Sequence, residues 1–440
     1  MSVGPAARVV AVRSATTVVP LPRPLRLGAM TVERREYVGV RVVAETDDGR
    51  TVAGESYALT REAPMAELVD RLVAPHVVGR EVVASDGVTA RQSVGTAWEA
   101  ALRGSAIVGR IGLVRRAIGL VDVALWDLAG RLAGRPVWSL LDDGADLAGA
   151  AEPGVGGDRD VPSRAVAGSP GDGTSGTAAA VPRPAILVAA YPTPGRTARD
   201  VADEVLAHAR AGWPLLKISR SPDRALMRDL LAILRAELPD VTGRPTVAGR
   251  SGVVVDVGFG WRDADEALAD LDAWGVTGAA GQPGDAEPAL AWLEDPLLPE
   301  DAVGAARVRD ASGLPLSVGD EVTDPEVFAH LAMLGALDVP RVDVVAIGGI
   351  TVADPLVRAW AARGMVVSSH VYPEVSVHLG GAAGIGVETF DRSPAGNPYD
   401  PAPLLVRGGP VFDGGHATPP DAPGLGFTLD PDRFDLEATP

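Results

Sequence analysis

The chain has 440 residues, of which 46% are hydrophobic and 22% charged, the composition of a globular protein that can bury a large core. Its net charge of −18 argues against a nucleic-acid partner, because nucleic-acid phosphates would be repelled. The absence of cysteine excludes disulfides, thiolate catalysis and cysteine-ligated metal centres. No run approaches the roughly 20 apolar residues that span a bilayer, and the first 20 residues lack the pattern of a signal peptide, so we expect no membrane partner and a cytoplasmic location.

The first third of the chain indicates an α+β domain. Residues 31–60 alternate polar and apolar side chains around an Asp-Asp-Gly turn, which predicts an antiparallel hairpin. From Ala63 to Leu141 the apolar spacing is helical, and Gly134 with Pro136 indicates a helix end. We therefore predict an N-terminal α+β capping domain over residues 1–141.

Two segments are rich in small and polar residues. Residues 142–182 contain almost no large apolar side chains, so they cannot bury enough surface to offset the entropy of ordering. We interpret them as a low-complexity linker or insertion, and residues 278–289 as a shorter surface insert of the same kind.

From Arg183 onward, short apolar strands alternate with amphipathic helices. The strands are expected at 185–191, 214–219, 252–257, 291–296, 314–320, 341–347, 365–370 and 385–390. Helices are expected at 198–211, 223–238, 264–275, 325–334 and 352–364. Eight strands separated mostly by single helices predict a parallel β/α barrel over residues 183–400, of the α/β class. The tail, 401–440, has no barrel unit left to join, and we expect it to return to the capping domain.

Seven successive predicted strands each carry an ionisable residue in or directly after the apolar run. Because reactive groups of such barrels gather at the C-terminal ends of the strands, we expect these side chains to converge. A single one would be read as a solvated residue or a helix cap, but the whole series is difficult to explain in that way. The residues are Lys217, Asp256, Glu294, Asp320, Asp343, His370 and Glu388.

Three of these residues predict a metal site. Asp256, Glu294 and Asp320 come from adjacent strands, and three converging carboxylates would repel one another without a cation between them. Ligation by oxygen alone suits Mg²⁺, or Mn²⁺ as the second choice, and disfavours zinc. Glu321 follows Asp320 directly, and since adjacent strand residues face opposite ways, we expect it to be a neighbour of the site.

His370 and Asp343 predict an acid–base pair, because neighbouring strands would place the carboxylate beside the imidazole and raise its basicity. Lys217 is the only lysine among 40 basic residues. An ammonium is a compact charge whose pKa shifts readily, whereas guanidinium stays protonated, so a lone lysine at a strand end indicates a chemical role.

The chain resembles the enolase superfamily, specifically its mandelate racemase-like subgroup. The resemblance rests on AGES in the hairpin, VDVALWDLAGRLAGRPVWSLL at the end of the first domain, and LKIS, VVVD, LEDP, SVGDE, VDVVAIGGIT and SSHVYPE in the barrel. It implies a modified TIM barrel of the (β/α)7β type, Mg²⁺ held by Asp256, Glu294 and Asp320, and a His370–Asp343 dyad. It also implies that Glu388 donates a hydrogen bond to the substrate carboxylate and that the protein is a homo-oligomer.

The chain also departs from the subgroup. Where the subgroup's second strand reads Lys-x-Lys, this chain has Lys217-Ile218-Ser219, so the second lysine is replaced by Ser219. The usual Asp-x-Asn after the third strand is Asp256-Val257-Gly258, and Ala346 stands where the muconate-lactonizing branch has a lysine. These departures make a mechanism with two lysines difficult.

The expected reaction is removal of the proton α to the carboxylate of a small-molecule acid. A metal and Lys217 would stabilise the resulting enediolate. Dehydration of a sugar acid or other hydroxy acid needs one base and is preferred. Racemisation of a 2-hydroxy acid, which needs two bases, is the alternative, and a non-catalytic metal- and acid-binding barrel is a lesser one. Specificity is expected from loops at 21–31 and 55–61, which contain Arg23, Arg26, Tyr57 and Arg61.

Overall fold

The computed structural model describes residues 5–27, 30–143, 180–238, 252–276, 290–381, 385–392 and 399–437. The linker predicted at 142–182 and the insert predicted at 278–289 lie almost wholly outside these residues. None of the helices described is both long enough and apolar enough to cross a membrane.

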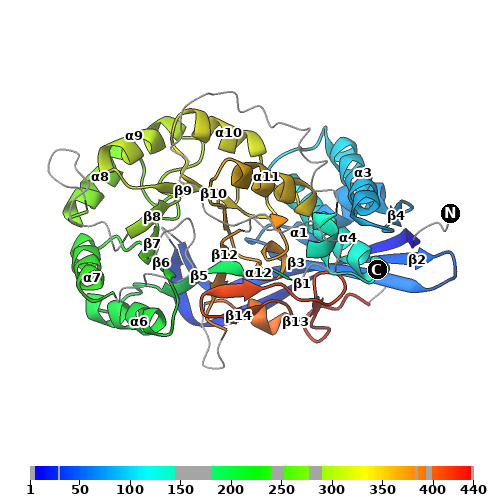
Figure 1. Ribbon diagram of the computed structural model, residues 1–440, viewed down its shortest axis with the longest axis horizontal. Coiled ribbons are helices and arrows are strands. Elements are labelled where there is room, and N and C mark those ends of the chain that lie inside the picture. The colour runs from blue at the N-terminus through cyan, green and yellow to red at the C-terminus, as the bar shows by residue number, and fades with distance from the viewer. Residues whose placement is uncertain are drawn as a thin grey trace, which may run out of the picture.

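An antiparallel sheet opens the fold, with strand order β3-β2-β1-β4. The strands are β1 (Ala6–Leu27), β2 (Met30–Thr46), β3 (Thr51–Leu59) and β4 (Glu81–Val83). β2 and β3 form the hairpin predicted at 31–60. The expectation of a loop at 21–31 was wrong, because β1 and β2 pair almost to their ends, with Leu25 opposite Val32. The paired ends of β1 and β2 reach the barrel, where Leu25 packs against Val188 and Tyr191 (Figure 1).

Helices follow the sheet, as the apolar spacing from Ala63 to Leu141 predicts. They are α1 (Met65–Leu68), the π-helix η1 (Val69–Val73), α2 (Ala74–Val77), α3 (Gly87–Ser105), α4 (Leu113–Ala133) and α5 (Val137–Asp142). Gly134 caps α4 in a left-handed conformation, in agreement with the predicted stop. β4 interrupts the helical stretch, which the local pattern could not reveal because its partner is β1, far away in sequence.

Eight parallel strands form the closed barrel that the sequence predicts. They are β5 (Arg183–Ala190), β6 (Leu215–Ser219), β7 (Gly252–Asp256), β8 (Leu290–Glu294), β9 (Leu316–Val318), β10 (Val339–Val342), β11 (Ser368–Ser369) and β12 (Val387–Phe390). Each strand from β5 to β11 pairs in parallel with the next. A bridge between Ser368 and Gly386 and the β12–β5 pairing close the ring.

Several barrel strands end earlier than predicted. β9, β10 and β11 stop at Val318, Val342 and Ser369, so Asp320, Asp343 and His370 lie in the turns that follow. At Asp343 the reason is local: its carboxylate accepts hydrogen bonds from the backbone N–H groups of Val345 and Ala346, which turns the chain out of the strand.

Helices surround the barrel. They are α6 (Ala198–Arg210), α7 (Arg224–Glu237), α8 (Ala264–Ala273), α9 (Ala302–Ser312), α10 (Pro325–Met333), α11 (Ile350–Ala362) and α12 (Pro373–Ser376). The sequence did not predict α9, because the residues on its buried side are mainly small and the spacing of its apolar residues is only weakly helical. Asp301 caps it through a hydrogen bond from the Gly304 N–H.

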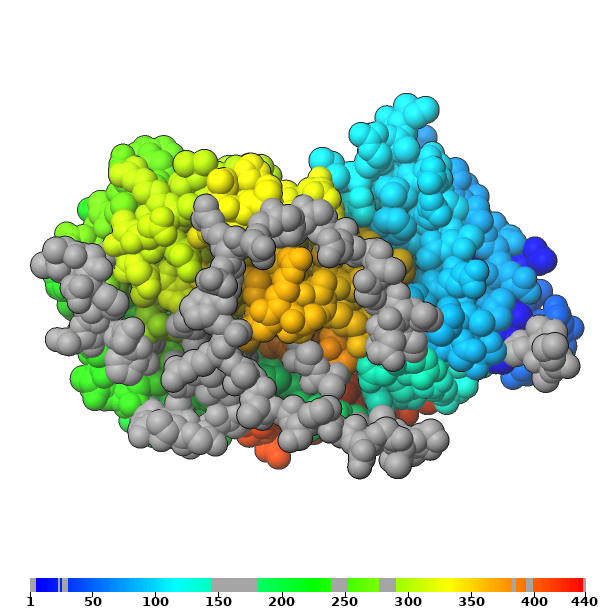
Figure 2. Space-filling view, turned by 45° about the horizontal axis from the view of Figure 1, so that its top comes forward, coloured from blue at the N-terminus to red at the C-terminus, as the bar shows by residue number. Residues whose placement is uncertain are grey.

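The tail contains η4 (Ala402–Leu404), β13 (Val406–Gly408), β14 (Val411–Asp413), β15 (His416–Thr418) and β16 (Phe427–Leu429). β15 pairs with β5 of the barrel, while the Leu429 N–H bonds Glu55 on β3. One hydrophobic cluster runs from the N-terminal sheet through α4 into the barrel. In Figure 2 the N-terminal part, in blue and cyan, lies directly against the yellow and orange barrel segments.

Candidate active site

The register of the barrel strands places the acid–base pair. Val342 of β10 lies opposite Ser369 of β11, so the residues that follow, Asp343 and His370, are neighbours at the same end of the barrel. His370 Nδ1 lies 2.9 Å from Asp343 Oδ2, and both side chains are buried. The imidazole Nε2 is therefore left to face the interior of the site, 3.5 Å from Asp320 Oδ2.

The three predicted metal-binding carboxylates also converge. Asp256 and Glu294 are direct partners in the β7–β8 pairing, and Asp320 follows the next strand. One oxygen from each of Asp256, Glu294 and Asp320 lies within 4.8 Å of the other two. Glu321 belongs to a different group, because its oxygens lie near Asp343 and His370.

Lys217 and Glu388 complete this end of the barrel. Lys217 Nζ is hydrogen-bonded to Glu294 and lies 3.0 Å from Asp256 Oδ2 and 2.7 Å from Glu388 Oε2. Those neighbouring carboxylates raise the pKa of Lys217 well above its ordinary value, although burial and Arg341 act in the opposite direction. Ser219 lines the cavity beside these residues.

Arg341 was missed by the sequence reasoning, and it lies in the middle of the site. Its side chain is fully buried, and its guanidinium bonds Asp320, Glu388 (2.7 Å) and the Ser369 carbonyl (2.6 Å). It also lies 3.3 Å from Glu294 Oε2. The signal was present: Arg341 precedes Asp343 by two positions, the strand period that puts two side chains on one face.

Asp295 is a second residue that the sequence reasoning missed. It is fully buried, has a positive φ of 45°, and accepts hydrogen bonds from the N–H groups of Gly319 (2.8 Å) and Asp320 (3.3 Å). It thereby fixes the turn that presents Asp320. Burial, with the charges of Asp320 and Glu294, raises the pKa of Asp295 well above its usual value.

Carboxylates outnumber cations among the described residues at the centre of the site. Four carboxylates and two cations meet here: Asp256, Glu294, Asp320, Glu388, Lys217 and Arg341. Burial raises the pKa of Glu294 to about 7 despite Arg341 and Lys217. For Asp320, Arg341 and His370 outweigh burial and hold the pKa far below its ordinary value. With every group ionised, two negative charges remain, which one divalent cation would neutralise.

The surroundings of Glu388 suit a hydrogen-bond acceptor. Burial would raise its pKa, but Arg341 and Lys217 outweigh burial and lower it to about 2. Its oxygens accept hydrogen bonds from both cations and from the Val371 N–H. Glu388 thus accepts hydrogen bonds in this structure, and the donor role toward a substrate carboxylate that the resemblance implies stays a prediction.

The N-terminal domain contributes to the same site through α4. Arg116 bonds Glu321 and the hydroxyl of Tyr372 (2.9 Å), and lies 4.0 Å from Asp343. Arg61, next to β3, lies 2.8 Å from the same Glu321 carboxylate. Asp343 is thus flanked by a cation from the capping domain and by His370 from the barrel. Burial alone would raise the pKa of Asp343, but His370 and Arg116 have the larger effect, so the pKa lies below its ordinary value.

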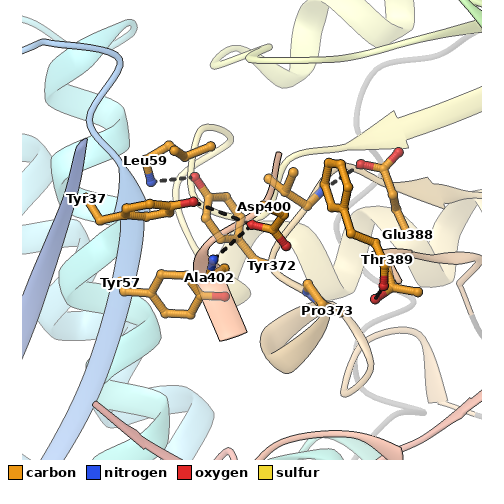
Figure 3. A pocket seen from close by; sticks show the side chains of 11 residues that line it. Tyr37, Tyr57, Leu59, Tyr372, Pro373, Glu388, Thr389, Asp400 and Ala402 are labelled. Carbon is orange, nitrogen blue, oxygen red and sulfur yellow. Dashed lines mark hydrogen bonds between the residues drawn. The ribbon is translucent and has the colours of Figure 1, made fainter. Parts of the chain in front are cut away.

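These groups open into a cavity of about 510 Å³ between the barrel and the N-terminal sheet. Its lining includes Lys217 and His370 from the barrel and Arg35 and Arg61 from the sheet side. Of the predicted specificity residues, Arg61 lines this cavity, whereas Tyr57 lines a smaller one beside it. There Tyr37, Tyr57 and Tyr372 surround Asp400 (Figure 3). The side chains of Arg23 and Arg26 lie outside the described residues.

The donor set fits a hard divalent cation. All three predicted ligands offer oxygen, and the described residues place no histidine or sulfur among them. No described residue donates a hydrogen bond to the buried Glu294 Oε2, and Arg341 lies 3.3 Å from it as an ion pair, so this acceptor still has room for a bound cation.

Comparison with known proteins agrees with this geometry. Residues 200–433 match the family described as enolase C-terminal domain-like, and residues 10–142 match the N-terminal domain of mandelate racemase and muconate lactonizing enzyme. A 3,6-anhydro-alpha-L-galactonate cycloisomerase of Streptomyces coelicolor is 27% identical over 96% of this chain and 98% of its own. A D-galactonate dehydratase family member of Catenulispora acidiphila is 26% identical over 90% of this chain and 84% of its own.

A solved structure shows the same fold. It is an L-talarate dehydratase of Polaromonas sp., complexed with Mg and L-glucarate. It is 21% identical, with a TM-score of 0.68 over 97% of this chain and 96% of its own. On these matches and this architecture, the chain belongs to the mandelate racemase/muconate lactonizing enzyme family, within the enolase superfamily of enzymes.

Proposed function

We propose that the protein is a Mg²⁺-dependent dehydratase of a sugar acid or other hydroxy acid. The observation that carries the proposal is the convergence of Asp256, Glu294 and Asp320 within 4.8 Å, next to an imidazole whose Nδ1 is held 2.9 Å from Asp343. Relatives and a neighbour of the same fold are named as dehydratases, and the neighbour is complexed with Mg and an acid sugar.

The metal would be held by Asp256, Glu294 and Asp320, with Mn²⁺ as a substitute. When bound, it supplies the positive charge that makes the proton next to a carboxylate acidic enough to remove. The buried Lys217 ammonium adds charge stabilisation where negative charge develops.

His370 is the proposed base. Its Nε2 takes the α proton, and Asp343 holds the ring through Nδ1 and stabilises the imidazolium that forms. The same Nε2–H then protonates the departing β-hydroxyl, which leaves as water, and the resulting enol tautomerises to a 2-keto-3-deoxy acid. One group thus removes and returns the proton, so the step needs no second base.

The contacts of Lys217 favour dehydration over racemisation. Its ammonium group meets three carboxylates, those of Asp256, Glu294 and Glu388. A proton acceptor on the second face of the substrate would need a free lone pair, and this nitrogen has none available while it is held in this way. Ser219, in the position of the absent second lysine, is not a base at neutral pH.

A panel of aldonic and aldaric acids with MgCl₂ tests the proposal. In D₂O, the wild type should release a 2-keto-3-deoxy acid, which semicarbazide detects, whereas His370→Asn should lose roughly 10²–10⁴-fold in kcat. Exchange of the α proton with inversion and no elimination would identify a racemase instead. Binding of metal and acid without exchange or elimination would support the non-catalytic barrel.

A further inference from the structure

Arg35 lies on β2 near the barrel, and its side chain faces the active-site cavity. Exposure alternates along this part of the strand, since Arg34 is exposed while Arg35 and Tyr37 are buried. Only 8% of Arg35 is exposed, and none of the described residues forms a hydrogen bond with its buried Nε. The side chain lines the active-site cavity together with Tyr37 and Tyr191.

Arg35 differs from the other arginines that line this cavity. Arg61 and Arg116 are paired with Glu321, and Arg220 is paired with Asp270. Among the residues that the structure describes, no carboxylate oxygen lies within 4.0 Å of an Arg35 side-chain nitrogen, the limit for an ion pair. Asp400 lines the same cavity, but it accepts hydrogen bonds from the Ala402 N–H and the Tyr37 hydroxyl.

A buried guanidinium that forms no ion pair is unfavourable for folding, and an apolar side chain would pack at this position without that cost. Arginine cannot relieve the cost by losing its proton. Its planar set of N–H donors matches a carboxylate or phosphate in bidentate geometry. At the barrel end of the site Lys217, which lines the cavity, and the fully buried Arg341 already have carboxylate partners. At the sheet side Arg35 forms no ion pair with any described carboxylate, although Asp400 is near enough for the Arg35 charge to oppose the rise in its pKa that burial causes.

We propose that Arg35 binds a second anionic group of the substrate, a terminal carboxylate or phosphate remote from the carboxylate that undergoes reaction. The inference rests on the proposed function and deepens it, because it makes the substrate a diacid, or a sugar acid phosphate as the other source of the same anion. One cavity joins Arg35 to Lys217 and His370, so a single extended ligand can reach both ends.

Calorimetric binding to the His370→Asn protein with MgCl₂ tests this without turnover. The probes are acids matched in C2–C5 configuration, D-galactonate with galactarate and D-gluconate with D-glucarate, and 6-phospho-D-gluconate for the phosphate arm. We expect a diacid or the phosphate to bind about 10- to 100-fold more tightly than its monoacid. Adding Arg35→Gln should remove this advantage and leave monoacid binding within about threefold, since only the distal contact is lost.

Arg34→Gln is the matched control, because Arg34 is the exposed neighbour and forms a surface ion pair with Glu62. It should leave the preference unchanged. The melting temperature of Arg35→Gln should not fall, since an unpaired buried charge has been removed. Equal affinity for the members of every pair, or an equal loss for monoacids and diacids in Arg35→Gln, would overturn the inference. A lower melting temperature with loss of both ligand classes would also overturn it, in favour of a structural role.

The proposed function can fail separately. If the wild type exchanges no α proton of any acid, yet the Arg35-dependent preference is measured, the chemistry proposed above is wrong while the anion subsite stands.

Discussion

Asp343 holds the His370 ring in one orientation, and replacing a single oxygen of its carboxylate tests this role. Asp343→Asn keeps the size of the side chain but replaces the charged acceptor at His370 Nδ1 with an amide, which favours the wrong tautomer. We expect kcat to fall by roughly 10²–10⁴-fold, with the melting temperature little changed. Steady-state rates and Mg²⁺ titration should be measured together, because the affinity for Mg²⁺ should be nearly preserved. A matched loss of Mg²⁺ binding would contradict the role assigned here.

Arg341 is the residue on which the buried carboxylates depend when no metal is bound. Arg341→Met would leave Asp320 and Glu388 without the cation that they share, although Lys217 would still contact Glu388. The free energy of unfolding in EDTA should fall by about 3–5 kcal/mol, since removing one partner strands the others. Added MgCl₂ should recover part of the loss.

Urea denaturation with and without metal measures both effects. The control is Arg228→Met, which removes an exposed pair with Asp229 and should change stability by no more than about 0.5 kcal/mol. If Arg341→Met were as stable as Arg228→Met in EDTA, the carboxylates would not need this cation.

At the scale of elements, the site depends on how closely α4 approaches the turn after β10. A Cβ atom on Gly119 would lie 2.1 Å from the Val345 carbonyl oxygen, which is backbone and cannot move alone. Gly119→Ala should therefore push α4 away from the turn that begins at Asp343. We expect a loss of about 1–3 kcal/mol in unfolding free energy and a fall in kcat.

Gly95→Ala is the matched control, since Gly95 is also inside a helix, but apart from that helix's own backbone and its two chain neighbours no described atom would lie within 4 Å of its Cβ. Alanine there should stabilise the protein by up to about 1 kcal/mol through helix propensity. If the two alanine variants had the same stability, the close approach of α4 would not be a constraint on the fold.

Across the whole molecule, His378 joins three parts of the chain. Its Nδ1 accepts from the Trp138 N–H at the end of the capping domain, and its Nε2 donates to the Leu425 carbonyl of the tail. Burial lowers the pKa of His378 to about 3, whereas an unfolded histidine titrates near 6.5. The neutral ring therefore contributes stability above about pH 6.5, and that contribution is lost as the pH falls toward 3.

Between pH 7 and pH 5 this group alone should cost the wild type about 2 kcal/mol of unfolding free energy. His378→Gln keeps an acceptor and a donor but takes up no proton, so its stability should fall less over the same range. The stability difference between the two proteins, from urea denaturation at several pH values, should therefore shrink as the pH falls. Parallel curves would contradict the linkage.

Much of this molecule could be predicted from local patterns. Eight apolar segments with helices between them predict a barrel, and an acidic or basic residue on seven of these strands indicates where the chemistry lies. These predictions succeed because strand-end position and side-chain alternation are properties of short segments. The placement of Asp256 beside Glu294, and of Asp343 beside His370, follows from parallel pairing of neighbouring strands.

Other features depend on segments that meet only when the barrel closes against the N-terminal sheet. The sequence by itself determined the fold class, the family and the set of converging strand-end residues. Only the tertiary structure decided that Arg341 pairs with Asp320 and Glu388, and that Arg35 is buried beside the cavity without an ion pair to any described residue. The reason is physical: the local pattern of the chain determines which way a side chain points, but burial and charge pairing are set by residues distant in sequence.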